Sequence, residues 1–392
     1  MRIAYLSYSP LRAGVANAVH VMNMCSAFSR NGHETALFAR GSGGRRAAPE
    51  IFSKYGVSDA FELRLRPSLR VKLVGRLYYG FRQALHARLM SRADVYYARC
   101  LVSAAFVLWL GGAAILEVHE LPHSALERRM QRFVLGHRNL RRLVVISQAL
   151  LEDLALVHRG LLDDVDCVVA PDGANASAPT ETFPLERGPG RQVGYAGGLR
   201  PGNGIGTLLA LAENSPRDTF HVLGGSAQDI AGWRMLQKSA NVVWYGRSAP
   251  ARVPAFLAAC DVLLAPYGHG AKTSSGNDTS RWMSPLKIFE YMASGKPMIV
   301  SDFPVLREVL TDDIAELVEP SNVDAWRAAL ARLDDEAARK RLGDAAREAF
   351  ESRYTWAARA RSVLEGLDEA PVRRPRKSSD EGVPVTSATG RA

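Results

Sequence analysis

Cysteine is scarce in this sequence of 392 residues. The four cysteines, at positions 25, 100, 167 and 260, are far apart and each lies among apolar neighbours. None belongs to a CxxC pair, which argues against a cysteine zinc site and a disulfide framework and favours a reducing compartment. The opening MRIAYLSYSP has one arginine before a short apolar run and no small-residue cleavage site. It therefore predicts a first β-strand and not a signal peptide.

A hydrophobic run of membrane-spanning length is also missing. The longest candidate, 100–116, has 17 residues without a charge, just under the usual length of a span, and Gly111-Gly112 divides it. We interpret the run as a buried helix followed by a buried strand over Ile115–His119.

Acidic residues are absent from 64–92, which holds eight basic residues. Nearly the whole net charge of +10 lies in the first 175 residues, with 23 Lys+Arg against 14 Asp+Glu. Such a stretch favours an anionic surface, either lipid headgroups or nucleic acid, and no nucleic-acid-binding module accompanies it. Apolar residues at every fourth position from Leu69 to Leu89 predict an amphipathic helix over Ser68–Met90. We expect this helix to bind an anionic membrane surface; the alternative is a domain helix whose apolar side faces the core and whose arginines are solvated.

Short apolar strands alternate with helices along most of the chain, which predicts the α/β class with parallel sheets covered on both faces. The Pro- and Gly-rich segment 176–190 interrupts this alternation and divides the chain. We expect a first doubly wound, Rossmann-like domain over 1–175, the linker 176–190 and a second such domain over 191–350. A helical segment 351–368 and a disordered tail 369–392 follow. Two such domains face a cleft, and ligands bind beyond the carboxyl ends of the strands.

The most informative segment is SPLKIFEYMASGKPMIVSD, residues 284–302. Ser284 and Pro285 predict a helix start, where free N–H groups form an anion site. Lys287 lies in the first turn, where a cation is unfavourable for the helix itself, and a bound phosphate would explain it. Glu290, one turn later, can accept hydrogen bonds from the two hydroxyls of a ribose. The alternative is that both are ordinary exposed helical residues.

This segment resembles the nucleotide-binding signature of family-4 glycosyltransferases, which have the two-domain GT-B architecture. The resemblance covers nearly all of the folded chain. The further matching pieces are the opening strand with its Gly14 loop, VVISQALLEDL (144–154), VVAPDGAN (168–175), VGYAGGLRPGNGIGTLL (193–209), VVWYGR (242–247), CDVLLAPYG (260–268) and YTWAARARSVLEGL (354–367). The last piece resembles the family's final helix, which crosses back to the first domain.

The resemblance implies transfer of a sugar from a nucleotide-sugar with retention of configuration, no cofactor and no obligatory metal. Glu290 would hold the ribose, and the turn Ser284, Pro285, Leu286 and Lys287 would meet the diphosphate. His119 occupies the family's position for a histidine near the reacting sugar; the alternative is a structural histidine. Gly14 would let the first loop approach the cleft.

Two departures from the family pattern stand out. Trp282 occupies the position where the family commonly has an acid near the donor sugar. Gly198 and Asn203 occupy the positions of an arginine and a lysine that meet the diphosphate, and Arg200 between them can substitute. The alternative for Arg200 is a surface turn residue.

We therefore predict a retaining hexosyltransferase that uses a UDP- or GDP-sugar, with His119, Lys287 and Arg200 as its catalytic residues. Its expected role is bacterial polysaccharide or glycolipid synthesis, from the cytoplasm or the inner face of the cell membrane. The expected partners are the donor, a lipid-linked glycan acceptor and an anionic membrane, with no nucleic acid. The alternatives are a nucleotide-sugar epimerase of the same fold and a catalytically inactive membrane-associated scaffold.

Overall fold

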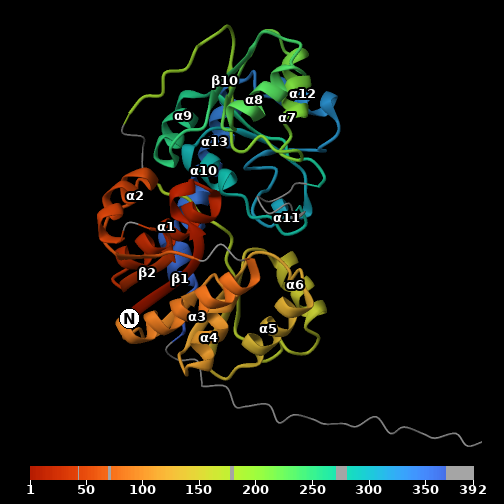
Figure 1. Cartoon of the computed structure of the whole chain (residues 1–392). Helices are drawn as coiled ribbons and strands as arrows, with labels where there is room; N and C mark the ends of the chain where they lie inside the picture. Colours follow the sequence, from red (N-terminus) through yellow and green to blue (C-terminus); the bar gives the residue numbers. More distant parts are fainter. Residues whose placement is uncertain (43, 69–71, 177–180, 271–279, 368–392) are drawn as a thin grey trace, which may run out of the picture.

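The fold follows the predicted α/β alternation. The computed structural model describes residues 1–42, 44–68, 72–176, 181–270 and 280–367. The predicted disordered tail 369–392 lies outside the described residues. Figure 1 shows two α/β halves, one from the red and orange start of the chain and the other from its green and blue remainder.

The first half contains a seven-stranded parallel sheet in the order β3-β2-β1-β4-β5-β6-β7. Its strands are β1 (Arg2–Pro10), β2 (Glu34–Arg40), β3 (Glu62–Arg66), β4 (Val95–Ala98), β5 (Ala114–Val118), β6 (Leu140–Val145) and β7 (Cys167–Val169). Its helices are η1 (Leu11–Ala13), α1 (Ala16–Arg30), η2 (Gly44–Ala47), α2 (Ala48–Tyr55), α3 (Lys72–Met90), α4 (Leu101–Trp109), α5 (Ala125–Gly136) and α6 (Gln148–Val157). In register, Ile3 of the central β1 pairs with Thr35 of β2 and with Val95 of β4.

The second half contains a six-stranded parallel sheet in the order β10-β9-β8-β11-β12-β13. Its strands are β8 (Gln192–Ala196), β9 (Thr219–Leu223), β10 (Val242–Gly246), β11 (Val262–Ala265), β12 (Met298–Ser301) and β13 (Glu316–Val318). The helices that follow in this half are α7 (Ile205–Glu213), α8 (Ala227–Arg234), η3 (Pro250–Arg252), α9 (Val253–Ala259), α10 (Leu286–Ser294), α11 (Pro304–Arg307), α12 (Val323–Arg332) and α13 (Glu336–Arg353). Both sheets have the doubly wound order, so the fold class predicted from the sequence is confirmed.

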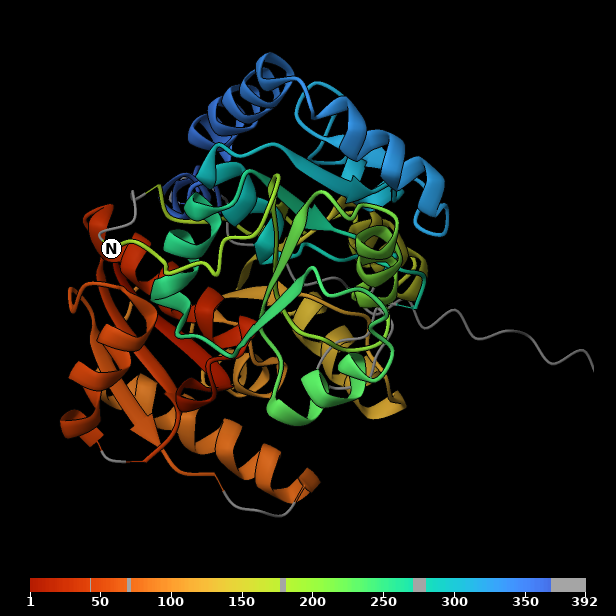
Figure 2. The same ribbon diagram turned by 90° about the horizontal axis from the view of Figure 1, so that it is seen from above.

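The last helix, α14 (Trp356–Ser362), returns to the first half. Trp356, Ala360 and Val363 are buried in the same hydrophobic cluster as β1 and α1. The two crossings of the chain between the halves pair with each other, because Ala174 donates to Tyr354 and accepts from Trp356. Gly173 permits this close approach, since a Cβ atom there would lie 2.7 Å from the Tyr354 carbonyl oxygen. Figure 2, seen from above, shows the second half lying over the first.

The basic stretch 64–92 differs from the prediction. Arg64 and Arg66 belong to β3, which the sequence analysis did not predict, and the described helix begins at Lys72; Leu69 and Arg70 lie outside the described residues. Two arginines of the stretch have acidic partners from outside it, Arg64 with Glu62 and Arg76 with Glu127.

Three of the apolar residues at every fourth position of α3, namely Phe81, Leu85 and Leu89, are exposed and do not face the core. Phe81 is 36% exposed and Leu89 is 70% exposed. The buried face of α3 consists instead of Gly75, Tyr79, Gly80, Gln83, Ala84 and Ala87. Gly80 is required by the packing of α3 on α4, because a Cβ atom there would lie 2.4 Å from the side chain of Val102. The buried face of α3 therefore combines glycine and alanine with Tyr79 and Gln83, and Phe81, Leu85 and Leu89 lie on its exposed side.

Candidate active site

The carboxyl ends of the central strands supply the candidate active site, as the rule for doubly wound sheets requires. In the first half, the switch of strand order falls between β1 and β4, which lead to the Gly14 loop and to Arg99. In the second half it falls between β8 and β11, which lead to the turn 197–204 and to the segment before α10.

Lys287 lies at the start of α10, beside the turn that follows β8. Its ammonium nitrogen Nζ is buried and has no hydrogen-bond partner among the described residues. It lies 4.0 Å from the ring centre of Tyr195 and 4.8 Å from that of Tyr267. Burial lowers the pKa of Lys287 to about 7, although Glu290 opposes the shift. A buried amine without an anionic partner is costly, and a bound phosphate would supply that partner.

A glycine turn lies beside this ammonium group. A Cβ atom at Gly197 would lie 2.8 Å from Lys287 Nζ, so the glycine leaves room for the ammonium in its present position. A Cβ atom at Gly224 would lie 1.8 Å from the Gly197 carbonyl oxygen, which places a second glycine loop directly against the first. Lys287 belongs to the first turn of α10, and a helix start of this kind with a lysine favours a phosphate group.

Glu290 follows Lys287 by one turn on α10, and burial raises its pKa to about 7, against the influence of Lys287. The helix holds both side chains on one face because residues three apart lie side by side. It ends at Gly295, which has the left-handed conformation with φ 65°.

Ser284 has a different role from the predicted N-cap. The residue that precedes α10 is Pro285, which makes no side-chain capping bond. Ser284 Oγ instead accepts a hydrogen bond of 2.8 Å from the backbone N–H of Asp172 in the first half. Leu286 also packs against the hydrophobic cluster of the first half. The turn 284–287 therefore lies at the junction of the two halves.

His119 lies immediately beyond β5 and is held from both sides. Its Nε2 atom is 2.6 Å from Glu117 Oε1, and its Nδ1 atom is 3.1 Å from Arg99 Nη2. A guanidinium can only donate, so Nδ1 is the acceptor and Nε2 carries the hydrogen that His119 donates to Glu117. Burial, with help from Arg99, lowers the pKa of His119 to about 4. His119 is thus a neutral imidazole of defined tautomer near pH 7.

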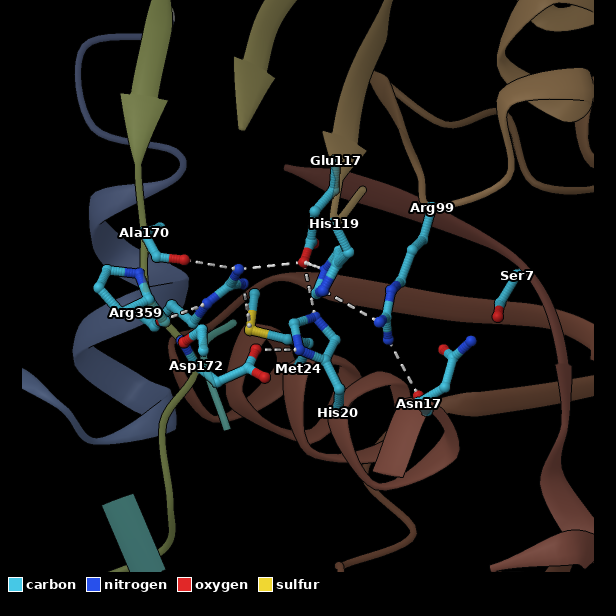
Figure 3. A network of polar contacts seen from close by, with 12 residues as sticks. Ser7, Asn17, His20, Met24, Arg99, Glu117, His119, Ala170, Asp172 and Arg359 are labelled. Atoms are coloured by element: carbon cyan, nitrogen blue, oxygen red, sulfur yellow. Dashed lines mark hydrogen bonds and ion pairs between the residues drawn. The ribbon is translucent and has the colours of Figure 1, made fainter. Parts of the chain in front are cut away.

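Glu117 joins His119 to a buried polar cluster, drawn in Figure 3. His20 of α1 lies 2.8 Å from Glu117 Oε1 through Nε2, and 2.7 Å from Asp172 Oδ1 through Nδ1. Arg359 of α14 donates to Glu117 Oε1 over 3.0 Å. Burial opposes ionisation of Glu117, but Arg359, His20 and the histidine hydrogen bonds outweigh it and hold the pKa of this carboxyl well below its usual value.

The group His20, Glu117 and His119 has the residue types of a metal site, and its ligand atoms lie within 4.8 Å of one another. Its present geometry is that of a hydrogen-bonded cluster, because His119 Nε2 carries a hydrogen and two guanidinium groups lie against it. The sequence analysis did not identify His20, Arg99, Glu117, Asp172 or Arg359. The sequence feature that could have indicated this cluster is Glu117, a carboxylate in an otherwise apolar strand.

The other predicted residues lie as follows. Gly14 ends η1 in the left-handed conformation with φ 63°. The exposed carbonyl of Gly198 accepts hydrogen bonds from Tyr195 Oη and Asn203 Nδ2. Arg200 is exposed, and its charge acts on Asp229 at the start of α8. The Asp229 carboxylate itself accepts hydrogen bonds from Ser226, so Arg200 is only within electrostatic range of it.

Trp282 joins the two halves. Its indole N–H donates to Asp153 Oδ2 of α6, and its ring packs against the hydrophobic cluster of the first half. Asp153 also accepts two hydrogen bonds from Arg281. The position where the resemblance implied an acid on the donor side is therefore used for contact between the halves.

Comparisons with known proteins cover both halves of the chain. The model for Glycosyltransferase Family 4 matches residues 18–177, and the model described as glycosyl transferase-like matches residues 206–365. The putative teichuronic acid biosynthesis glycosyltransferase TuaH of Bacillus subtilis is 29% identical over 147 residues, which are 37% of this chain and 35% of that protein. The chain thus matches only about a third of the length of this curated relative.

Solved structures with the same fold include GT-B glycosyltransferases. Sucrose-phosphate synthase from Thermosynechococcus elongatus aligns with a TM-score of 0.69 and 17% identity, over 94% of this chain and 98% of the other. Anabaena HepE, solved in complex with UDP-glucose, aligns with a TM-score of 0.67 and 16% identity, over 94% of this chain and all of the other. The fold is therefore GT-B, and with both family matches the chain belongs to the family-4, group 1 glycosyltransferases.

Proposed function

We propose that the chain is a retaining glycosyltransferase that moves a sugar from a UDP- or GDP-sugar to an acceptor hydroxyl, with no obligatory metal. The observation that carries the proposal is the buried Lys287 ammonium, which lies between a glycine turn and the start of α10 and has no hydrogen-bond partner in the part of the chain that the structure describes. Its surroundings fit a diphosphate. The family membership, the UDP-glucose complex of HepE and the name of TuaH support a nucleotide-sugar donor and a role in polysaccharide synthesis.

In this proposal the protein acts by positioning and by charge. Lys287 and the N–H groups of α10 stabilise the negative charge that develops on the leaving diphosphate. Glu290 accepts hydrogen bonds from the ribose, and neutral His119 contacts the donor sugar. Because Lys287 gains its anionic partner only with the donor, its charge is most valuable where the bond to the leaving group is broken.

The nucleobase has a candidate place in the same half. A pocket of about 500 Å³ lies beyond β9 and β10, lined by Gly225, Ser226, Trp244, Gly246 and Arg247 among others. Both strands present their carboxyl ends there, next to the Gly224 loop. The proposed donor would thus extend from this pocket to Lys287.

The test is a thermal-shift screen of nucleotides and nucleotide-sugars, followed by NMR of the products. A specific donor is expected to raise Tm, because a ligand that binds only the folded state stabilises it. With an acceptor, the product is expected to keep the donor's anomeric configuration. If an isomeric nucleotide-sugar forms without any acceptor, the protein is a nucleotide-sugar epimerase. If a donor binds but no acceptor is glycosylated, the protein is the catalytically inactive scaffold.

We also propose that α3 brings the enzyme to an anionic membrane surface, where a lipid-linked acceptor would be found. Tyr78, Phe81, Leu85 and Leu89 are exposed on α3, beside the exposed Arg82 and Arg88. The neighbouring α4 and α5 add exposed Trp109 and Phe133. Apolar and aromatic side chains next to arginines are typical of helices that lie in the membrane interface. No helix among the described residues meets the length and hydropathy of a membrane span.

Liposome co-sedimentation measures this interaction. We expect binding to vesicles with anionic lipid at low salt, and much less binding to neutral vesicles or at high salt. Replacing Arg76, Arg82 and Arg88 by glutamine should weaken binding roughly a hundredfold, since each basic residue contributes about 1 kcal/mol at an anionic leaflet.

The matched control replaces three exposed arginines of the second half by glutamine: Arg217, Arg327 and Arg341. It removes the same formal charge far along the chain from α3 and should leave vesicle binding unchanged. Equal losses in both triple variants, or equal binding to anionic and neutral vesicles, would contradict the proposed membrane surface and leave the transferase proposal intact.

A further inference from the structure

Arg359 is a buried arginine that reaches the first half from the end of the chain. It is 3% exposed, and α14 inserts it between α1 and the ends of β5 and β7 (Figure 3). Its guanidinium donates to Glu117 Oε1 over 3.0 Å, to the carbonyl of Ala170 over 3.0 Å and to the carbonyl of Pro171 over 2.9 Å. These contacts hold it in a single position.

Glu117 needs this partner. One oxygen of its fully buried carboxylate lies against both His20 and His119, and burying a carboxylate without a compensating charge is unfavourable. Arg359 is the only guanidinium that contacts this carboxylate among the described residues, whereas Arg99 contacts His119 and Asp172 contacts His20. Removing Arg359 takes one positive charge away from the buried carboxylate, which makes protonation of the cluster more favourable.

We propose that Arg359 is a positioning residue for His119. By keeping Glu117 ionised as an acceptor, it holds His119 in the neutral form that carries its hydrogen on Nε2. The arrangement requires that α14 be docked on the first half, so the last helix completes a site whose other members come from residues before 175. The catalytic meaning of this role rests on the proposed function, whereas the effect on His119 does not.

Other titratable groups also surround Glu117 and His119. Tyr97 of β4, Tyr5 of β1 and Cys25 of α1 are buried near Glu117, and burial raises the pKa of each well above its usual value. They are therefore uncharged near pH 7. Asp172 faces His20, which contacts the ring of His119 edge-on at 5.1 Å between ring centres. The charged groups that can change the state of His119 are thus Arg99, Glu117, His20, Asp172 and Arg359.

The experiment follows the imidazole nitrogens of His119 by NMR across pH in protein labelled with ¹⁵N only in histidine. The His119 signals are assigned by their loss in His119→Asn. In the wild type we expect the Nε2–H tautomer with protonation only near pH 4. In Arg359→Met the protonation midpoint of the cluster, seen at His119, should rise by about 1–3 pH units, the usual influence of an adjacent opposite charge. Arg359→Lys, which keeps the charge, should restore the wild-type behaviour.

Arg142→Met is the matched control. Arg142 is also buried and also fastens the end of α14, through a hydrogen bond of 3.0 Å to the Val363 carbonyl, but its ion pair is with Asp166. It should lower Tm without changing the titration of His119. A wild-type titration in folded Arg359→Met, or an equal shift in Arg359→Lys, would overturn the proposal. If Arg359→Met does not fold, Arg359→Gln takes its place, because glutamine also removes the charge but can still donate a hydrogen bond; a wild-type titration in folded Arg359→Gln would equally overturn the proposal. The NMR titration needs no sugar donor. Its result therefore tests the role of Arg359 separately from the proposed glycosyltransferase activity.

Discussion

Replacing Lys287 by methionine is expected to lower kcat by about 10²–10³-fold once a donor is known, with a smaller loss of donor affinity. Methionine fills the space between Tyr195 and Tyr267 without the charge, and a positioned charge at a developing anion has an effect of this size. The ammonium is buried and hydrogen-bonded to none of the described residues, so Lys287→Met should also raise or preserve Tm.

Steady-state kinetics and calorimetric donor binding measure the two effects. Lys296→Met is the control, because Lys296 lies just beyond the other end of α10; it should leave kcat unchanged. Equal losses of affinity and kcat/KM in Lys287→Met, with kcat unchanged, would show that Lys287 only binds the donor.

Replacing Glu290 by glutamine is expected to weaken nucleotide binding about ten- to a hundredfold. The reason is the loss of charge-assisted hydrogen bonds to the ribose, with a cost of about 1.5–3 kcal/mol. Calorimetry with UDP- and GDP-sugars measures it, and Glu348→Gln on the exposed side of α13 is the control. Unchanged affinity in folded Glu290→Gln would remove Glu290 from the site.

The pH dependence of donor affinity distinguishes the contribution of Lys287 from that of Glu290. Lys287 must be protonated to hold the diphosphate, and its pKa of about 7 in the free protein means that affinity falls as the pH rises above 7. Glu290 must be ionised to accept the ribose hydroxyls, and its pKa of about 7 means that affinity falls as the pH drops below 7. Wild-type affinity should therefore be greatest near pH 7. Lys287→Met should lose only the decrease at high pH, and Glu290→Gln only the decrease at low pH.

The sequence by itself determined the fold class and the helix α10 that carries Lys287 and Glu290. Short apolar strands, helices ended by glycine and the break over 176–190 are local features, because each depends on the periodicity and turn residues of a few neighbouring positions. The same is true of Lys287 and Glu290, whose spacing along one helix places them on one face before any tertiary contact exists.

Only the tertiary structure decided what surrounds these residues. The outward position of Phe81 and Leu89 depends on how closely Gly80 lets α3 approach α4, and periodicity alone does not choose between two faces. Ser284 and Trp282 serve contacts between the halves because partners more than a hundred residues away meet them there. The cluster around His119 brings together α1, β5, the end of β7 and α14. The counter-charge of a buried carboxylate must be close to it in space but not in the sequence. Arg359 can therefore come from the last helix, and no local sequence pattern predicts its contact with Glu117.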